Sequence, residues 1–307
     1  MKTKKEDVQE ESDSFNETQR LLEMSIDEMD KSYKSKGANL GISSGIKNLD
    51  SILQGFREGD LNIIASRPSI GKTMFALTVF SNIATQGINS LYISFDKYEN
   101  ELLNNILSII THVNYANIEQ GYLTPSDFKN ILEAAKLVDK NSGSIFLKSF
   151  YNTDLVKLKS FIKKRIDEDK IKIVFIDYLT MIIPTPTYSN RWEQVSEISR
   201  SLKSMAMEFK IPFVVLCPIN RNIVDVSSPQ ITNLSESGSI EYEADRVILL
   251  YKKANDKKEE NFTLLDKNEN IITIYIAKNK RGPIKTFDLL FDYKNKRITE
   301  VIEKNIT

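Results

Sequence analysis

Short apolar runs alternate with longer segments of helical periodicity from Gly41 onward. Runs of about five apolar residues predict buried strands, and apolar residues three and four apart predict helices that pack on them. The predicted strands are Leu61–Ala65, Ser90–Phe95, Ser144–Lys148, Ile171–Ile176 and Phe213–Leu216. The predicted helices are Thr73–Thr85, Asn100–His112, Asp154–Asp167 and Trp192–Phe209. This alternation indicates an α/β fold with a mostly parallel, twisted sheet and helices on both faces.

The pattern changes in the last quarter of the chain. Arg246–Tyr251, Ile271–Ala277 and Lys285–Phe291 read as strands separated by polar turns, without long helices between them. Strands joined by short turns pair antiparallel. We therefore expect these three strands to extend the sheet antiparallel at one edge.

Residues 1–36 form a polar extension, followed by one large domain that we place at residues 37–303. Within the extension, Phe15, Leu22, Ile26 and Met29 recur at spacings that put them on one face of a helix. A lone helix of this length is marginal in water, so its stripe needs a partner surface. The stripe packs either on its own domain or, as a linker helix, on a neighbouring subunit.

Composition restricts the choice of function. The 307 residues carry 42 Lys and Arg against 42 Asp and Glu, which argues against a basic surface over the whole chain. One cysteine, Cys217, and one histidine, His112, exclude a disulfide scaffold and a Cys/His zinc site. No apolar run approaches the roughly 20 residues of a membrane span, and the Lys- and Glu-rich start has no signal-peptide pattern. We expect a soluble, cytoplasmic protein.

The segment Ser66-Arg67-Pro68-Ser69-Ile70-Gly71-Lys72-Thr73 follows a predicted strand and opens a predicted helix. It matches a phosphate-binding loop (P-loop) whose first glycine is replaced by Ser66. Backbone N–H groups and the helix dipole would hold phosphates there. Lys72 would reach the β- and γ-phosphates of ATP, and the Thr73 hydroxyl would hold Mg²⁺. The alternative is a chance Gly-Lys-Thr in a surface loop.

Two aspartates end predicted strands downstream of this loop. Asp177 closes the run Ile173-Val174-Phe175-Ile176, the pattern of a Walker B aspartate that orders Mg²⁺. Asp96 follows the strand after the P-loop helix, where a carboxylate could orient or deprotonate the attacking water. Each could instead simply cap the turn that follows its strand.

Three further segments carry polar groups of possible function. Asn220 follows the third strand end and could sense the γ-phosphate, whereas Arg221 could equally be a solvated charge. The loop from Ser235 to Glu241 contains Glu236 and Gly238, and its glycine would let the backbone approach a nucleic acid. The turn from Lys278 to Pro283 contains Lys280 and Arg281 and could supply a cation to a nucleotide on a neighbouring subunit. A plain surface loop and a solvated turn are the alternatives for the last two.

Taken in this order, the motifs resemble the ATPase domain of replicative DnaB-type helicases over most of Gly41–Thr299. The resemblance rests on these segments of the sequence: Gly41-Ile42-Ser43-Ser44-Gly45, Leu49-Asp50, Gly55–Leu61, Arg67–Thr73, Asp177-Tyr178-Leu179, Glu197–Lys203, Glu236–Glu241, Ala244-Asp245, Ala277-Lys278 and Gly282-Pro283.

The resemblance implies a RecA-like core that assembles as a homo-hexameric ring around single-stranded DNA, with ATP and Mg²⁺ bound between subunits. Residues 1–36 resemble the linker helix that docks on the next subunit. The family's N-terminal collar domain has no counterpart in this sequence, so we do not expect primase contact through this chain alone. A helicase loader is a further possible partner.

Four positions depart from the family pattern. The catalytic Glu falls at Asp96, the phosphate-sensing Gln at Pro218, the finger Arg at Lys280, and a DNA-contacting Arg at Ser235. Asp96 is a shorter base than Glu, and Pro218 has no side-chain donor. Lys280 is a point charge, whereas Arg has a planar fork. All three changes weaken the groups around the γ-phosphate. Two alternatives to a helicase motor therefore stay open: a degenerate paralogue that binds ATP and DNA or a partner ring with little hydrolysis, and a strand-exchange recombinase.

Overall fold

The computed structural model describes residues 18–27, 29–30, 33, 41–139, 143–186, 188–219, 231, 238–252 and 270–301. The chain divides into two units, Met1–Leu40 and Gly41–Thr307. In the first unit, residues 18–27 are helical, and the side chains of Leu22, Ile26 and Met29 are exposed. Phe15 lies outside the described residues, and the surface on which the stripe packs stays a prediction.

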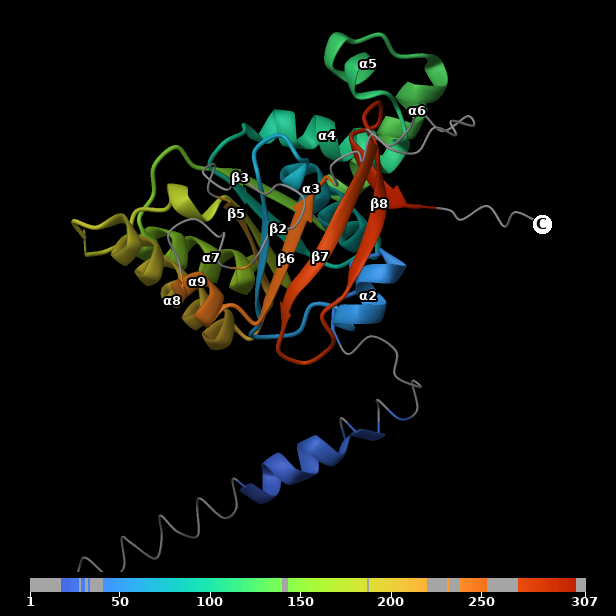
Figure 1. The fold of residues 1–307 in the computed structure, drawn as a ribbon. Helices are drawn as coiled ribbons and strands as arrows, with labels where there is room; N and C mark the ends of the chain where they lie inside the picture. Colours follow the sequence, from blue (N-terminus) through green and yellow to red (C-terminus); the bar gives the residue numbers. More distant parts are fainter. Residues whose placement is uncertain are drawn as a thin grey trace, which may run out of the picture. The chain divides into compact units, whose positions relative to one another are not determined.

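The second unit is built on a mixed sheet (Figure 1). Its described strands are β1 (Leu61–Ser66), β2 (Ser90–Ser94), β3 (Ile145–Ser149), β4 (Ile173–Asp177), β5 (Phe213–Pro218), β6 (Arg246–Tyr251), β7 (Ile271–Asn279), β8 (Thr286–Asp292) and β9 (Arg297–Glu300). They lie side by side in the order β3-β2-β4-β5-β1-β6-β7-β8-β9. All pairs from β3 to β6 are parallel, and all pairs from β6 to β9 are antiparallel.

Helices cover both faces of this sheet. The described helices are α2 (Lys47–Leu53), α3 (Lys72–Thr85), α4 (Glu99–Thr111), α5 (Tyr115–Gln120), α6 (Pro125–Ala134), α7 (Leu155–Asp169), α8 (Arg191–Phe209) and α9 (Gly238–Glu243). Helices α2, α3 and α4 share one apolar cluster with Ile64 of β1, whereas α7, α8 and α9 share the other with Ile63 and Ala65. Successive strand residues point to opposite faces, so each central strand contributes to both clusters and reads as a continuous apolar run.

The structure confirms the alternating strands and helices expected from the sequence, with boundaries that agree to within two residues at each end. The prediction of an antiparallel extension is correct from β7 onward. It is wrong for β6, which runs parallel to β1 with Asn62 opposite Arg246 and Ser66 opposite Leu250. The direction of β6 is set by the connection from α9, which returns the chain to the end of the sheet from which β1 starts. None of the described helices is long and apolar enough to cross a bilayer.

An aromatic cluster joins α3 to the sheet. Phe80 of α3 meets Tyr92 of β2 and Phe175 of β4 edge-on, with ring centroids 5.5 Å apart in both pairs. Phe80 is fully buried. Because α3 begins at the P-loop, this contact fixes the helix whose first turn forms the candidate site.

We expect Phe80→Ala to lower the free energy of unfolding by about 3–5 kcal/mol, the cost of removing a buried aromatic side chain and leaving a cavity. Urea unfolding followed by circular dichroism measures it. Phe128→Ala on α6 is the matched control, because that ring is 55% exposed and its loss should change stability by less than about 0.5 kcal/mol. Equal effects of the two substitutions would contradict a core role for Phe80.

Candidate nucleotide-binding site

The P-loop lies where the sequence predicts it, between β1 and α3. Ser69 and Gly71 adopt positive φ angles of 65° and 111°. A Cβ on Gly71 would approach Ile272 Cδ1 to 3.2 Å in addition to the strained φ, so a glycine suits this position. Gly71 also caps α3 without a side-chain hydrogen bond. The first N–H groups of the helix therefore face the loop with no side-chain acceptor at the cap, as an anion site requires.

The structure brings Thr73 and Asp177 together. The Thr73 hydroxyl donates a 2.8 Å hydrogen bond to Asp177 Oδ2, which leaves the hydroxyl oxygen's lone pairs available to a cation. Asp177 is 1% exposed. Burial raises the pKa of its carboxyl group, opposed by the Lys72 cation and by hydrogen bonds from Thr73 and Tyr92. One hydroxyl and one carboxylate are a partial Mg²⁺ site of the kind that phosphate oxygens complete.

Lys72 is half-buried beside the same carboxylate. Burial lowers the pKa of its ammonium group, whereas the nearby Asp177, Cys217 and Asp96 raise it. The ammonium nitrogen also lies 5.4 Å from the centre of the Tyr178 ring, within the range of a cation–π contact. Lys72 is therefore held over the end of the sheet, at the place where phosphates would enter.

Asp96 lies at the same edge of the sheet, exposed at the turn after β2. The Ser94 hydroxyl accepts hydrogen bonds from the backbone N–H groups of Asp96 and Lys97, which fixes the turn. The Asp96 charge acts on Lys72 and Asp177. The structure thus places this candidate base beside the P-loop lysine and the Walker B aspartate, where the sequence predicts it.

Pro218 lies across the ladder from Ser66, at the end of β5. It offers no side-chain donor at a position that borders the P-loop. Asn220, the candidate phosphate sensor that follows, lies outside the described residues. So do Arg221, Ser235 and Glu236, and their proposed roles remain predictions. Gly238 is described as the first residue of helix α9, so the expectation of a loop as far as Glu241 is wrong from Gly238 onward.

The basic turn, residues 278–283, lies at the opposite end of the strands from the P-loop of its own chain. Asn279 pairs with Arg246, and Arg246 pairs with Asn62 at the start of β1. The P-loop follows Ser66, four residues further along β1, or about 13 Å at the rise of a strand. Lys278, Lys280 and Arg281 are therefore not brought together with Lys72 within one chain.

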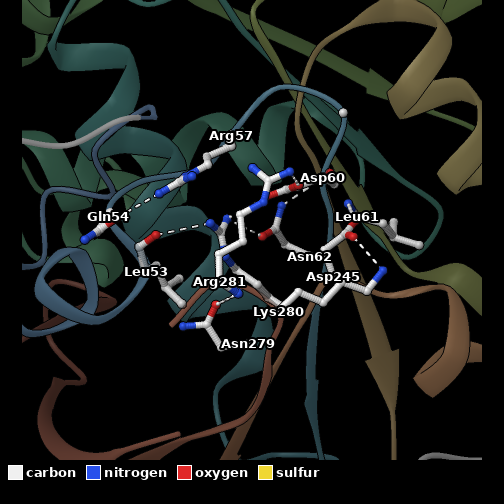
Figure 2. A network of polar contacts seen from close by, with 12 residues as sticks. Leu53, Gln54, Arg57, Asp60, Leu61, Asn62, Asp245, Asn279, Lys280 and Arg281 are labelled. Carbon is white, nitrogen blue, oxygen red and sulfur yellow. Dashed lines mark hydrogen bonds and ion pairs between the residues drawn. The ribbon is translucent and has the colours of Figure 1, made fainter. Parts of the chain in front are cut away.

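Each cation of this turn contacts its own subunit. The Lys278 ammonium group donates to the backbone carbonyls of Glu241 and Tyr242 at the end of α9. Lys280 pairs with Asp245 at 2.8 Å, and Arg281 pairs with Asp60 at 3.6 Å. Figure 2 shows Lys280 and Arg281 as part of one polar network with these carboxylates.

Sequence reasoning missed Tyr92 at the site and gave Tyr178 no role there. Tyr92, fully buried in β2, donates a 3.0 Å hydrogen bond to Asp177 Oδ2. Nothing in the local pattern marks it, because a tyrosine within an apolar strand looks like any other core residue. Tyr178 lies under Lys72. Its place directly after Asp177 was the available signal.

A loop joins a strand to a helix, and its lysine and hydroxyl lie beside a buried aspartate on a mostly parallel sheet. This arrangement defines a P-loop nucleotide-binding domain of the RecA-like class. Residues 41–300 match the model of the DnaB-like helicase C-terminal domain. The chain belongs to that family.

Curated relatives and solved structures agree with this assignment. The chain is 34% identical to the probable replicative DNA helicase of Trieres chinensis, over 98% of this chain and 65% of the relative. It is 33% identical to the replicative DNA helicase DnaC of Bacillus subtilis, over 91% and 60%. The chain thus spans less than two thirds of the length of these relatives. A solved ATPase domain superposes with a TM-score of 0.78 at 26% identity, over 92% of this chain and 99% of that domain.

Replacement of Asp177 by Asn should leave the metal-free, nucleotide-free protein at least as stable as the wild type at pH 7. Because burial raises the folded-state pKa of this carboxyl group above its ordinary value of 3.8, the folded state binds the extra proton. Ionisation of this carboxyl group therefore destabilises the folded state. This loss of stability is absent below the ordinary pKa and grows as pH rises through the raised pKa. Urea unfolding of both proteins from pH 4 to pH 7 should show their difference increasing with pH.

Asp154→Asn is the control of opposite sign. A hydrogen bond from the Lys157 backbone lowers the pKa of the Asp154 carboxyl group at the start of α7, so its charge stabilises the folded state at neutral pH. Asp154→Asn should destabilise the protein at pH 7 and lose that effect in acid. A fall in stability of Asp177→Asn that parallels Asp154→Asn would contradict the account of Asp177.

Proposed function

We propose that the chain is the ATP-hydrolysing motor of a replicative-type DNA helicase, a ring that translocates on single-stranded DNA. The observation that carries the proposal is the contact between Thr73 and Asp177 beside Lys72, in a chain of the DnaB-like helicase family. Relatives at 33–34% identity are replicative DNA helicases. The same proposal includes the expected cytoplasmic location.

ATP and Mg²⁺ are the proposed cofactors. The backbone of Ser66–Gly71 and the Lys72 ammonium group would hold the phosphates, and Thr73 with Asp177 would hold Mg²⁺, which would neutralise charge that develops on the phosphate oxygens. Asp96 would orient the attacking water and accept its proton. Its side chain is one methylene shorter than that of Glu, so we expect the water to be bound less firmly and hydrolysis to be slow.

The second half of each catalytic site would come from a neighbouring subunit. Lys278, Lys280 and Arg281 lie at the end of the strands opposite their own P-loop, which supports a role toward a nucleotide bound by another chain. Contacts in which one end of the strands meets the opposite end in the next copy are heterologous, and they form a ring when the rotation between copies closes or an open filament when it does not. This supports the proposed homo-hexameric ring with ATP between subunits.

DNA would run through the ring, contacted by Ser235 and Glu236 and by Gly238 at the start of α9. Asn220 would report the γ-phosphate. A loader is a further proposed partner. The chain superposes with a TM-score of 0.76 on a DnaB-like replicative helicase studied with primase. The proposal does not include primase contact through this chain.

Purified protein should hydrolyse ATP faster in the presence of single-stranded DNA and unwind a forked duplex. Lys72→Ala should reduce kcat by at least about a hundredfold, because the cation on the β- and γ-phosphates is lost. Steady-state ATPase assays and a strand-displacement assay measure both activities. Wild-type turnover no higher than that of Lys72→Ala would reject the motor and favour a degenerate, non-hydrolysing paralogue.

Subunit mixing tests the shared site. Rings assembled from Lys72→Ala subunits and Lys280→Ala/Arg281→Ala subunits should hydrolyse ATP faster than either pure ring. At equal mixing about a quarter of the heterologous interfaces join an intact P-loop to an intact basic turn. Mixing Lys72→Ala with Asp177→Asn is the matched control, because both defects lie on the same side of the interface and should not complement. Absence of recovery in the first mixture would show that the basic turn does not act across subunits.

A further inference from the structure

Two carboxylates stand at the starts of adjacent central strands. Asp60 directly precedes β1, and Asp245 directly precedes β6, which pairs with β1 in parallel. Both side chains are nearly buried, at 3% and 11% exposure. They therefore lie close together at the edge of the sheet that does not carry the P-loop.

Asp245 is anchored in the core of the domain. Its Oδ2 accepts hydrogen bonds from the Leu61 backbone N–H at 2.8 Å and from the Lys203 ammonium group at 2.6 Å. Lys203 in turn donates to the Gly59 carbonyl. Burial alone would raise the pKa of the Asp245 carboxyl group, but hydrogen bonds from Lys203 and Lys280 bring it below its ordinary value. The carboxylate is thus ionised and fixed in direction.

Asp60 is anchored by a buried cation. Arg246, 1% exposed, pairs with Asp60 at 3.1 Å and donates to the Asn62 side chain and the Leu53 carbonyl. The guanidinium group therefore has two hydrogen-bond acceptors and one ion-pair partner, so its buried charge is compensated. Burial raises the pKa of the Asp60 carboxyl group, and the Arg246 and Arg281 cations oppose that rise.

The remaining oxygens of these carboxylates face the basic turn. Asp245 Oδ1 binds Lys280 at 2.8 Å, and the Asp245 carbonyl also accepts the Lys280 backbone N–H at 3.1 Å. Asp60 Oδ1 lies 3.6 Å from Arg281. Lys280 and Arg281 remain 46% and 50% exposed. Four cations thus contact these two carboxylates: Lys203, Arg246, Lys280 and Arg281.

We propose that Asp245 is a positioning residue that aims the exposed Lys280 ammonium group at a nucleotide on the next subunit. The inference rests on the proposed function of the basic turn. A lysine offers three N–H donors. Asp245 takes one, which leaves two for phosphate oxygens. This carboxylate clamp removes rotamer freedom before the subunits meet, so less is lost when the contact forms.

The test is a double-mutant cycle on assembled rings with single-stranded DNA. Lys280→Ala should lower kcat for ATP by about a thousandfold, the lower end for loss of a trans-acting cation. Asp245→Asn should lower kcat by about 10- to 100-fold, the effect of displacing a catalytic group by about 1 Å. KM for ATP should change much less than kcat in both, because the P-loop and Lys72 that would hold the nucleotide are left intact. In the Lys280→Ala background, Asp245→Asn should have no further effect.

Asp169→Asn is the matched control. Asp169 on α7 pairs with Arg165 at 2.6 Å and its side chain is 20% exposed, close to the burial of Asp245. Its loss should leave kcat unchanged. If Asp245→Asn does not assemble, Asp245→Glu replaces it. That variant keeps the charge but moves the carboxylate by one methylene, and should lower kcat by about tenfold, again only when Lys280 is present.

Three results would overturn the inference. One is a normal kcat for Asp245→Asn or Asp245→Glu alongside an impaired Lys280→Ala. Another is an equal loss of kcat from the Asp245 substitution with and without Lys280, which would show that Asp245 acts independently of it. A normal kcat for Lys280→Ala alongside an inactive Lys72→Ala would remove the trans role of Lys280 itself, so failure of the proposed function is distinguishable from failure of the carboxylate clamp.

Discussion

The hydrogen bond from Thr73 to Asp177 depends on the parallel arrangement of the central strands more than on any local sequence. Thr73 follows β1 and Asp177 ends β4, and only β5 separates the two strands. Parallel strands bring their carboxyl ends to one edge, so a hydroxyl and a carboxylate 104 positions apart in the sequence come within 2.8 Å. The aromatic contacts of Phe80 with Tyr92 and Phe175 hold α3 over these strands.

That arrangement puts an aspartate where the fold alone would not favour one. Burial raises the pKa of the Asp177 carboxyl group despite Lys72 and two hydrogen bonds. A tyrosine on the neighbouring strand β2 donates its hydroxyl to the carboxylate, so the cost of the buried charge is reduced without being removed. Residual destabilisation of this kind is typical of a site built to bind a cation, because the ligand supplies the missing positive charge.

Much of the fold follows from the sequence, and the reasons for the exceptions are physical. The apolar runs at β1, β2, β4 and β5 are buried on both faces, so their pattern is unambiguous. The parallel direction of β6 could not be predicted from the sequence, since periodicity indicates which residues are buried but not which way a strand runs. Short elements such as α5, α9 and β9 carry too few residues for a period to emerge.

The site divides in the same way. The P-loop, Asp96 and Asp177 were predictable because each lies at a strand end with a local signature. The contacts of Asp245 were not, since its partners Leu61, Lys203 and Lys280 are distant in sequence. Nor does the sequence reveal that the basic turn faces away from its own P-loop, which follows only from the register of β7 on β6 and β6 on β1.

The buried pair of Asp60 and Arg246 has a different role from a surface ion pair. A buried ion pair contributes little net stability, because desolvation of both charges offsets their attraction. Loss of one partner nevertheless leaves an uncompensated buried charge. Its consequence here is geometric: Arg246 fixes the start of β6 against the start of β1, the two points from which Asp245 and Asp60 reach the basic turn. Buried groups therefore tie together the two strand starts that hold Lys280 and Arg281.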